Sequence, residues 1–207
     1  GLNGHTSQEK LHKMHGAGAV EGIEPLSEAG KFVTEEAYWR DYYNHPYFNY
    51  EWNNGILEEV PVSDVKQYSS FDWFDDLVRE FLQVNPIARK VGLEFGIRLT
   101  LPTKTTIRKP DLFLVRNDNA LVLQDDDRTY HGICDLCIEA LSDSDEHEIQ
   151  RDTVVKKAEY ETIGVHEYFI LDPSGEYRAF YRRTPAGKYG EIDAGPEQII
   201  RSEALPG

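Results

Sequence analysis

The chain has 207 residues, the size of one domain with short extensions. Hydrophobic residues make up 40% of the sequence, which is enough for a sizeable core and excludes wholesale disorder. The formal net charge is -15, and so acidic a protein repels phosphate backbones, which counts against nucleic-acid binding through a basic face.

Nothing in the sequence predicts secretion or membrane insertion. The first thirty residues contain no apolar stretch of the kind that a signal peptide needs, and no segment is apolar over the length that a bilayer requires. The two cysteines, Cys134 and Cys137, are expected to be small buried residues in a reducing compartment. We therefore expect a cytoplasmic protein with no membrane partner.

The N-terminal quarter of the chain predicts a tail, a short helix and a hairpin. Residues 1–30 are rich in Gly, His, Ser and Glu and are expected to form a flexible tail, and a helix is expected around residues 34–43. Asn53-Asn54-Gly55 is a turn signal between two strand-like arms, so residues 49–61 predict a β-hairpin.

The longest predicted element is a helix over residues 65–84. Its apolar side chains recur at helical spacing, and Asn85-Pro86 ends it. The residues expected to face the core are Phe71, Phe74, Leu77, Val78, Phe81 and Leu82. Alternation over residues 91–101 then predicts a strand, and a polar Thr-Lys turn leads to the next strand, over residues 109–115.

The remaining elements complete a mixed α/β pattern. In chain order they are a loop over 117–132, a strand over 133–141, a helix over 149–163 that Gly164 ends, and strands over 166–171 and 177–183. The last twenty residues are expected to be irregular. This order argues for a central sheet covered by helices. We divide the chain into a tail (1–30), a domain (31–183) and a C-terminal extension (184–207).

Two acidic residues lie in apolar, strand-like runs. Asp111 lies in KPDLFLV and Glu139 in ICDLCIEAL, and a buried carboxylate costs free energy unless something compensates for its charge. Mg²⁺ is typically held by one or two carboxylates together with waters and substrate phosphate oxygens. The pair therefore predicts a metal site. The alternative is that both are solvated, Asp111 opening its strand and Glu139 on a half-exposed strand.

Asp152, Lys156 and Tyr160 are spaced four residues apart and are expected to share one face of a helix. The simplest alternative is a surface Asp–Lys pair, which contributes about 0.3 kcal/mol. Two strand acids and a helix lysine are, however, the components of a metal-dependent phosphodiesterase.

The order of these motifs resembles a known family. They are Pro110-Asp111; Ile138-Glu139-Ala140-Leu141-Ser142; Arg151-Asp152, Lys156 and Tyr160; Gly164-Val165 and Glu167-Tyr168; and Asp172-Pro173. In this order and spacing, residues 45–183 resemble the Uma-two-type putative restriction endonuclease family, a branch of the PD-(D/E)XK nuclease superfamily. Tyr50-Glu51 followed by Gly55 resembles that family's N-terminal hairpin.

The resemblance implies a restriction-endonuclease-like core, in which helices flank a mixed central sheet and the site lies at the sheet's edge. It implies that Asp111, Glu139 and the main-chain carbonyl of Ala140 bind Mg²⁺ or Mn²⁺. The superfamily's lysine normally stands two residues after the second acid, where this chain has Leu141. In this branch the lysine matches Lys156 on the following helix.

The chain departs from the family pattern at two places. Ile56 stands where the family often has a Glu after the hairpin glycine, and Gln67-Tyr68 stands where the first helix often begins with a His. Glu58 or Glu59 could replace the missing acid, and we favour Glu58 because it shares strand parity with Ile56.

The leading hypothesis is a Mg²⁺- or Mn²⁺-dependent deoxyribonuclease. Asp111 and Glu139 would hold the metal ion, whose water attacks the phosphorus, and Lys156 would position that water. Asp152 would orient Lys156, and Tyr160 would help to shape the site.

Two other functions stay open. One is a non-catalytic binding or assembly protein on the nuclease scaffold, which the charge of -15 and Ile56 favour. The other is a metal-dependent enzyme acting on a small phosphate compound, which would need a narrow pocket. If the chain cleaves duplex DNA, a homodimer is expected because two strands require two sites.

Overall fold

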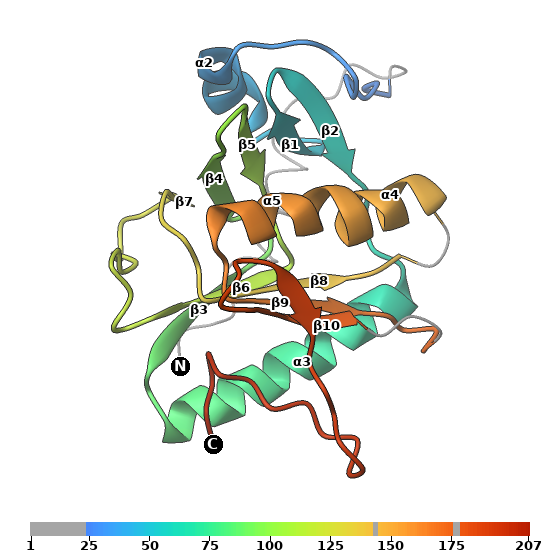
Figure 1. Cartoon of the computed structure of the whole chain (residues 1–207). Helices are drawn as coiled ribbons and strands as arrows, with labels where there is room; N and C mark the ends of the chain where they lie inside the picture. Colours follow the sequence, from blue (N-terminus) through green and yellow to red (C-terminus); the bar gives the residue numbers. More distant parts are fainter. Residues whose placement is uncertain (1–23, 143–144, 176–178) are drawn as a thin grey trace.

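The computed structural model describes residues 24–142, 145–175 and 179–207 (Figure 1). Most of the predicted tail, at 1–23, lies outside this part, as do the first two residues of the strand expected at 177–183. The helical elements are α2 Glu35–Ala37, η1 Tyr38–Tyr42, α3 Val65–Val84, α4 Glu146–Gln150, η2 Arg151–Val155 and α5 Lys156–Ile163, of which η1 and η2 are π-helical.

The strands build two sheets in the described part of the chain. They are β1 Asn49–Asn53, β2 Ile56–Val60, β3 Ala88–Gly92, β4 Gly96–Thr100, β5 Thr105–Arg108, β6 Leu112–Arg116, β7 Thr129–Tyr130, β8 Leu136–Ala140, β9 Glu167–Leu171, β10 Ala179–Arg183 and β11 Tyr189–Glu191. The larger sheet has the order β11-β10-β9-β8-β6-β3, and the smaller has the order β2-β1-β5-β4-β7.

The elements stack in four layers. Figure 1 shows α3 on one face of the larger sheet and the run from α4 to α5 on the other, with the smaller sheet beyond that run. Strand β8 pairs with β9 in parallel and with β6 in antiparallel orientation, so the larger sheet is mixed. The helix from α4 to α5 connects β8 to β9, as a parallel pair requires.

Burial on both faces explains the continuous apolar runs of the central strands. Leu136 and Ile138 of β8 pack towards α3 in one cluster, whereas Cys137 packs in the cluster on the opposite face. Glu139 shares the parity of Cys137, so its side chain points towards the helix from α4 to α5. The alternative of a half-exposed strand with solvated acids is wrong, because every residue of β8 is buried.

The register places the two predicted acids opposite each other. Leu112 of β6 pairs with Ile138 of β8, and one residue further along the two strands Asp111 stands opposite Glu139. The predicted strand over 109–115 begins only at Leu112, because Pro110 has no N–H to donate to a ladder.

The long helix is confirmed at 65–84. Asp64 caps it by accepting a hydrogen bond from the backbone N–H of Gln67, and it ends at Asn85. Phe71 and Val78 are buried against the larger sheet, whereas Leu77, which was expected in the core, is 45% exposed. The hairpin and the short helix before it are also confirmed.

The strand predicted over 91–101 is wrong, because the chain turns in the middle of it. Strands β3 and β4 belong to different sheets, and between them Leu93 and Glu94 have φ of 39° and 67°. Neither residue is one of the usual turn formers, so the pattern gave no warning. Strand β5 was missed because its two threonines read as part of a polar turn.

Two short strands lie where loop was expected. Strand β7 falls inside the predicted loop 117–132, and β11 falls inside the C-terminal stretch expected to be irregular. In the described part, no helix has both the length and the apolar character needed to cross a bilayer.

Candidate active site

The amine of Lys156 lies at the centre of a buried group of carboxylates. Its Nζ is 2.9 Å from Oε1 of Glu139, 2.9 Å from Oε1 of Glu51 and 3.3 Å from Oδ1 of Asp152. Lys156 is only 2% exposed. The alternative of a surface Asp–Lys pair is therefore wrong.

Three layers of the fold supply these groups. Glu51 lies on β1 of the smaller sheet, Glu139 lies on β8 of the larger sheet, and Lys156 begins α5, which runs between the two sheets (Figure 1). The site therefore forms only when both sheets pack against the same helix.

The helix that carries Lys156 is not the regular α-helix predicted over 149–163. It begins earlier, at Glu146, and residues Arg151–Val155 form a π turn, which contains one residue more than an α turn. Both Arg151 and Asp152 are buried there, together with Lys156. Such turns often occur at functional sites.

Asp111 joins the group from the neighbouring strand. Its Oδ2 accepts a hydrogen bond from the backbone N–H of Ala140, 2.7 Å away. The carbonyl of Ala140 accepts a hydrogen bond from the side chain of Gln67, with Nε2 and O 2.8 Å apart. Side chains thus replace the ladder at the end of β8, because β6 begins only at Leu112.

The acids outnumber the cation at their centre, and their pKa values reflect this excess. The pKa of Asp111 is raised to about 6, chiefly by burial and also by the nearby charge of Asp152, against the Ala140 hydrogen bond and Lys156, which lower it. Burial also raises the pKa of Glu139 well above its usual range, and that of Asp152 is raised for the same reason. In both cases Lys156 only partly opposes the shift.

Glu51 behaves in the opposite way. Burial would raise its pKa, but Lys156, Arg108 and Arg151 lower it to about 2, and a hydrogen bond from the Lys109 N–H adds to this. Burial lowers the pKa of Lys156, yet Glu139, Glu51 and Asp152 raise it well above its usual range. The Lys156–Glu51 pair is therefore ionised.

Arg108 bonds to the carboxylate oxygen of Glu51 that Lys156 does not contact. Its guanidinium is fully buried and lies 2.7 and 2.9 Å from the two carboxylate oxygens of Glu159, 2.6 Å from Glu58 and 3.2 Å from Glu51. Glu58, the predicted supporting acid, thus forms an ion pair with Arg108, whereas Glu51 forms the ion pair with Lys156. The two acids are direct partners in the β1–β2 register.

Sequence reasoning therefore missed Glu51 and Arg108 as members of the site. A signal for Glu51 was present, because Tyr50-Glu51 was part of the hairpin motif. The missing Glu at position 56 directed attention to β2 instead. Ile56 itself is exposed, so an acid at that position would lie outside the buried group.

Tyr160 is buried on the same helix as Lys156. Burial raises the pKa of its hydroxyl, and Cys137 and Glu139 raise it further. The hydroxyl has no hydrogen-bond partner among the described residues. Its part in shaping the site stays a prediction.

The residues present fit a divalent cation with oxygen ligands. Among the described residues, no three side chains of His, Cys, Asp or Glu are placed to hold a metal ion together. Asp111 and Glu139 instead provide two carboxylates beside one carbonyl, the ligand set that Mg²⁺ or Mn²⁺ accepts when waters complete it. Their raised pKa values indicate that the group lacks positive charge, which such a cation would supply.

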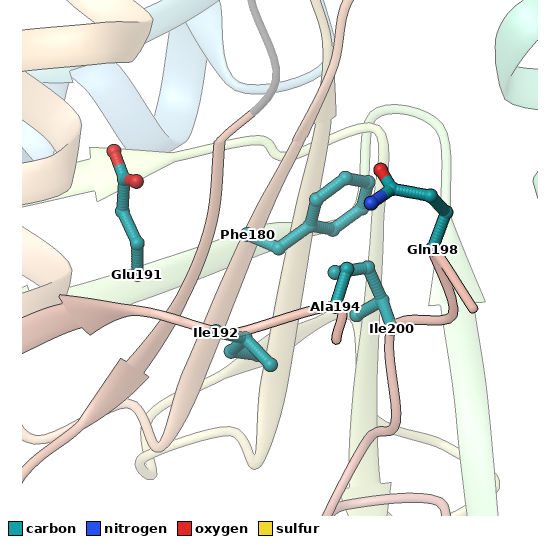
Figure 2. A pocket seen from close by; sticks show the side chains of 6 residues that line it. All are labelled: Phe180, Glu191, Ile192, Ala194, Gln198 and Ile200. Atoms are coloured by element: carbon teal, nitrogen blue, oxygen red, sulfur yellow. The ribbon is translucent and has the colours of Figure 1, made fainter. Parts of the chain in front are cut away.

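Two cavities in the described part of the chain lie away from this group. One, of about 140 Å³, lies among β10, β11 and the C-terminal segment, where Figure 2 shows the side chains that line it. The other, of about 310 Å³, is lined by residues between Ala120 and His131. Neither includes Asp111, Glu139 or Lys156, so neither provides the narrow pocket expected for a small phosphate compound.

Comparison with known proteins gives two findings. The profile of a family described as Uma2, putative restriction endonuclease, matches residues 36–207. A solved structure described as a putative nuclease belonging to DUF820, from Anabaena variabilis, has a similar fold, with a TM-score of 0.56 and 15% sequence identity over 75% of this chain and 82% of that one. No curated protein matches the sequence. The restriction-endonuclease-like fold and the family resemblance are thus confirmed.

Proposed function

The chain belongs to the Uma2 family of putative restriction endonucleases, and from this premise we propose that it is a divalent-metal-dependent endonuclease that hydrolyses DNA phosphodiester bonds. One observation carries the proposal. The Lys156 amine has three carboxylates within 3.3 Å, those of Glu51, Glu139 and Asp152. Asp111 lies beside this group on the neighbouring strand.

Each residue has a role that follows from its position. Asp111, Glu139 and the Ala140 carbonyl would hold Mg²⁺ or Mn²⁺, which supplies Lewis acidity at the phosphoryl group. Lys156 donates hydrogen bonds from a charged amine, so it can orient the attacking water and stabilise charge on the phosphate.

The supporting residues hold that amine in place. Glu51 and Asp152 both lie within ion-pair distance of Lys156 and restrict the direction of its Nζ. Arg108 in turn bonds to Glu51, and Glu58 bonds to Arg108. Glu58 would therefore act on Lys156 only indirectly, through Arg108 and Glu51.

The test is cleavage of plasmid and oligonucleotide DNA in Mg²⁺ and in Mn²⁺. We expect Asp111→Asn and Glu139→Gln each to lower the rate at least about 100-fold, because each removes a charge that holds the metal. Asp118→Asn is the control, because Asp118 is an exposed acid paired with Arg116, and it should leave the rate unchanged. Wild-type protein that cleaves no DNA form in either metal would overturn the proposal.

The burial of the group from solvent supports a second function. Glu51, Glu139 and Lys156 are each less than 5% exposed, as they would be in a binding or assembly protein that uses the acids and the lysine only for stability. The melting temperature in Mg²⁺ or Mn²⁺ separates the two, because a ligand of the native state must stabilise it. An unchanged melting temperature favours the binding protein.

A further inference from the structure

Gln67 contacts the candidate site but has no role in the mechanism above. It lies in the first turn of α3, and its side-chain amide donates to the Ala140 carbonyl at 2.8 Å. That carbonyl is the one assigned to the metal ion. The inference that follows rests on the proposed function.

The hydrogen bond arises from the unequal lengths of two strands. The N–H and C=O of Ala140 point to the side of β8 where β6 lies, but β6 begins at Leu112, whose partner is Ile138. The sheet therefore offers Ala140 no backbone partner on that side. The carboxylate of Asp111 accepts its N–H, and the amide of Gln67 donates to its C=O.

Packing fixes Gln67 at this place. Gln67 and Phe71 are four residues apart and share a face of α3, and Phe71 packs in the same buried cluster as Ile138 and Ala140. The backbone N–H of Gln67 is held by the Asp64 cap at 2.7 Å. The Asp64 cap and the packing of Phe71 therefore both fix the backbone from which the Gln67 side chain reaches the carbonyl.

We propose that Gln67 is a positioning residue that holds the Ala140 carbonyl in the orientation in which this oxygen binds the metal ion. A carbonyl oxygen has two lone pairs, so the hydrogen bond from Gln67 leaves one for a cation. The same residue is tied to Asp111 through its N–H. Gln67 thus acts on two of the three metal-binding groups at once.

The variants differ in whether they can donate to that oxygen. Gln67→Ala removes the donor, Gln67→His restores an N–H donor on a different side chain, and Gln67→Glu replaces the donor by an acceptor. Gln83→Ala is the matched control, because it is the same substitution at an exposed position of the same helix.

Two measurements test the inference. In metal-free protein, we expect faster hydrogen exchange at the Ala140 amide and a changed carbonyl ¹³C shift in Gln67→Ala but not in Gln83→Ala. In calorimetric titration with Mn²⁺, we expect Gln67→Ala to bind about 10-fold more weakly, because residues that orient metal ligands typically have effects of this size. Gln67→His should recover most of the affinity.

The outcomes are distinct. Loss of affinity in Gln67→Ala, at an unchanged melting temperature and with recovery in Gln67→His, supports the inference. Wild-type affinity in Gln67→Ala or Gln67→Glu overturns it and leaves the proposed function standing. A wild-type protein that binds no Mn²⁺ overturns both.

Discussion

Burial decides which acidic residues of this chain could act at the site. Asp111, Glu139 and Asp152 have raised pKa values because they share a single nearby amine in a poorly solvated place, whereas Glu51 keeps its charge through Lys156 and Arg108. Under the proposed function, a site built in this way should release protons when it binds a metal ion.

Asp111 should make the metal-free protein less stable as the pH rises. Its folded-state pKa of about 6 lies above the ordinary value of 3.8, so the folded protein binds more protons between these values, and stability falls as pH rises through that window. Asp111→Asn cannot ionise, so we expect it to be about 3 kcal/mol more stable than wild type at pH 8, and much closer to wild type at pH 4.

Urea unfolding at the two pH values measures this difference. Added Mn²⁺ should stabilise wild type at pH 8 and leave Asp111→Asn unchanged, since the variant lacks a ligand charge. Equal stabilities of the two metal-free proteins at pH 8 would contradict the electrostatic account of the site.

Lys156 should be the residue whose loss destabilises the site most. Lys156→Met leaves Glu139, Glu51 and Asp152 without their common cation, and removing one partner of a buried ion pair costs about 3–5 kcal/mol. Unfolding in urea is the measurement, and the loss should be smaller in a Glu139→Gln background because one uncompensated charge is gone.

The adjacent lysine provides the control for that prediction. Lys157 lies over the ring of Tyr181, with Nζ 4.0 Å from the ring centroid, and is only partly buried. Lys157→Met should cost about 1 kcal/mol or less. Equal losses at the two positions would show that the carboxylate group does not depend on Lys156.

At the scale of secondary structure, the close approach of β3 to the start of β6 fixes the backbone of Asp111. A Cβ on Gly92 would lie 2.8 Å from the Asp111 carbonyl oxygen, and the Leu93 N–H donates to that same oxygen at 3.2 Å. We expect Gly92→Ala to cost about 1–3 kcal/mol, because the backbone has to move, and to weaken Mn²⁺ binding.

Gly190→Ala is the matched control in strand β11. A Cβ there would meet only a Thr184 methyl group at 3.4 Å, an ordinary contact. Thermal unfolding and Mn²⁺ titration of the two variants separate a local effect at Asp111 from a general effect of alanine in a strand. Wild-type Mn²⁺ affinity in Gly92→Ala would count against the role of Asp111.

Sequence patterns predicted the elements that carry strong periodicity and missed those that depend on a local turn. The helix over 65–84 follows from its apolar spacing and its Asn-Pro end. The π turn at Arg151–Val155 has no comparable signal, because an extra residue in one turn becomes favourable only when both Arg151 and Asp152 find buried partners.

At the scale of the whole molecule, the charge of -15 should govern how the protein meets DNA. Proteins with a basic footprint lose affinity with salt at a slope of about -0.9 per phosphate contact. We expect the Asp152→Asn variant, which keeps the proposed metal ligands Asp111 and Glu139, to bind labelled DNA in Mg²⁺ with a salt-dependence slope near zero or positive. A steeply negative slope in fluorescence anisotropy would reveal a basic binding face.

The C-terminal segment should contribute to the stability of the larger sheet. Fully buried Glu167 on β9 accepts hydrogen bonds from the Ser202 hydroxyl and from the N–H groups of Glu203 and Ala204. Deleting residues 202–207 leaves Arg182 as the one described side chain bonded to this carboxylate, so we expect a loss of about 3 kcal/mol in urea unfolding.

A shorter deletion controls for the removal of the chain end. Deleting only residues 206–207 keeps the three donors to Glu167 and should change the stability by less than about 0.5 kcal/mol. Equal losses in the two deletions would mean that these bonds are not the reason for the effect. The division of the chain at residue 184 stays a prediction, as do a homodimer and a cytoplasmic location.

In the sequence by itself, alternation and helical spacing determined the mixed α/β fold class, because these patterns depend on neighbouring residues alone. The order and spacing of the motifs gave the family resemblance and, with it, the expected role of Lys156 on the helix after the strand of Glu139. Only the tertiary structure decided that Glu51 is the acid that meets Lys156, that Arg108 holds it, and that Gln67 reaches the Ala140 carbonyl. These contacts join residues 57 to 105 positions apart, and they form because two sheets and α3 pack around one helix and one strand end. No local pattern records that packing.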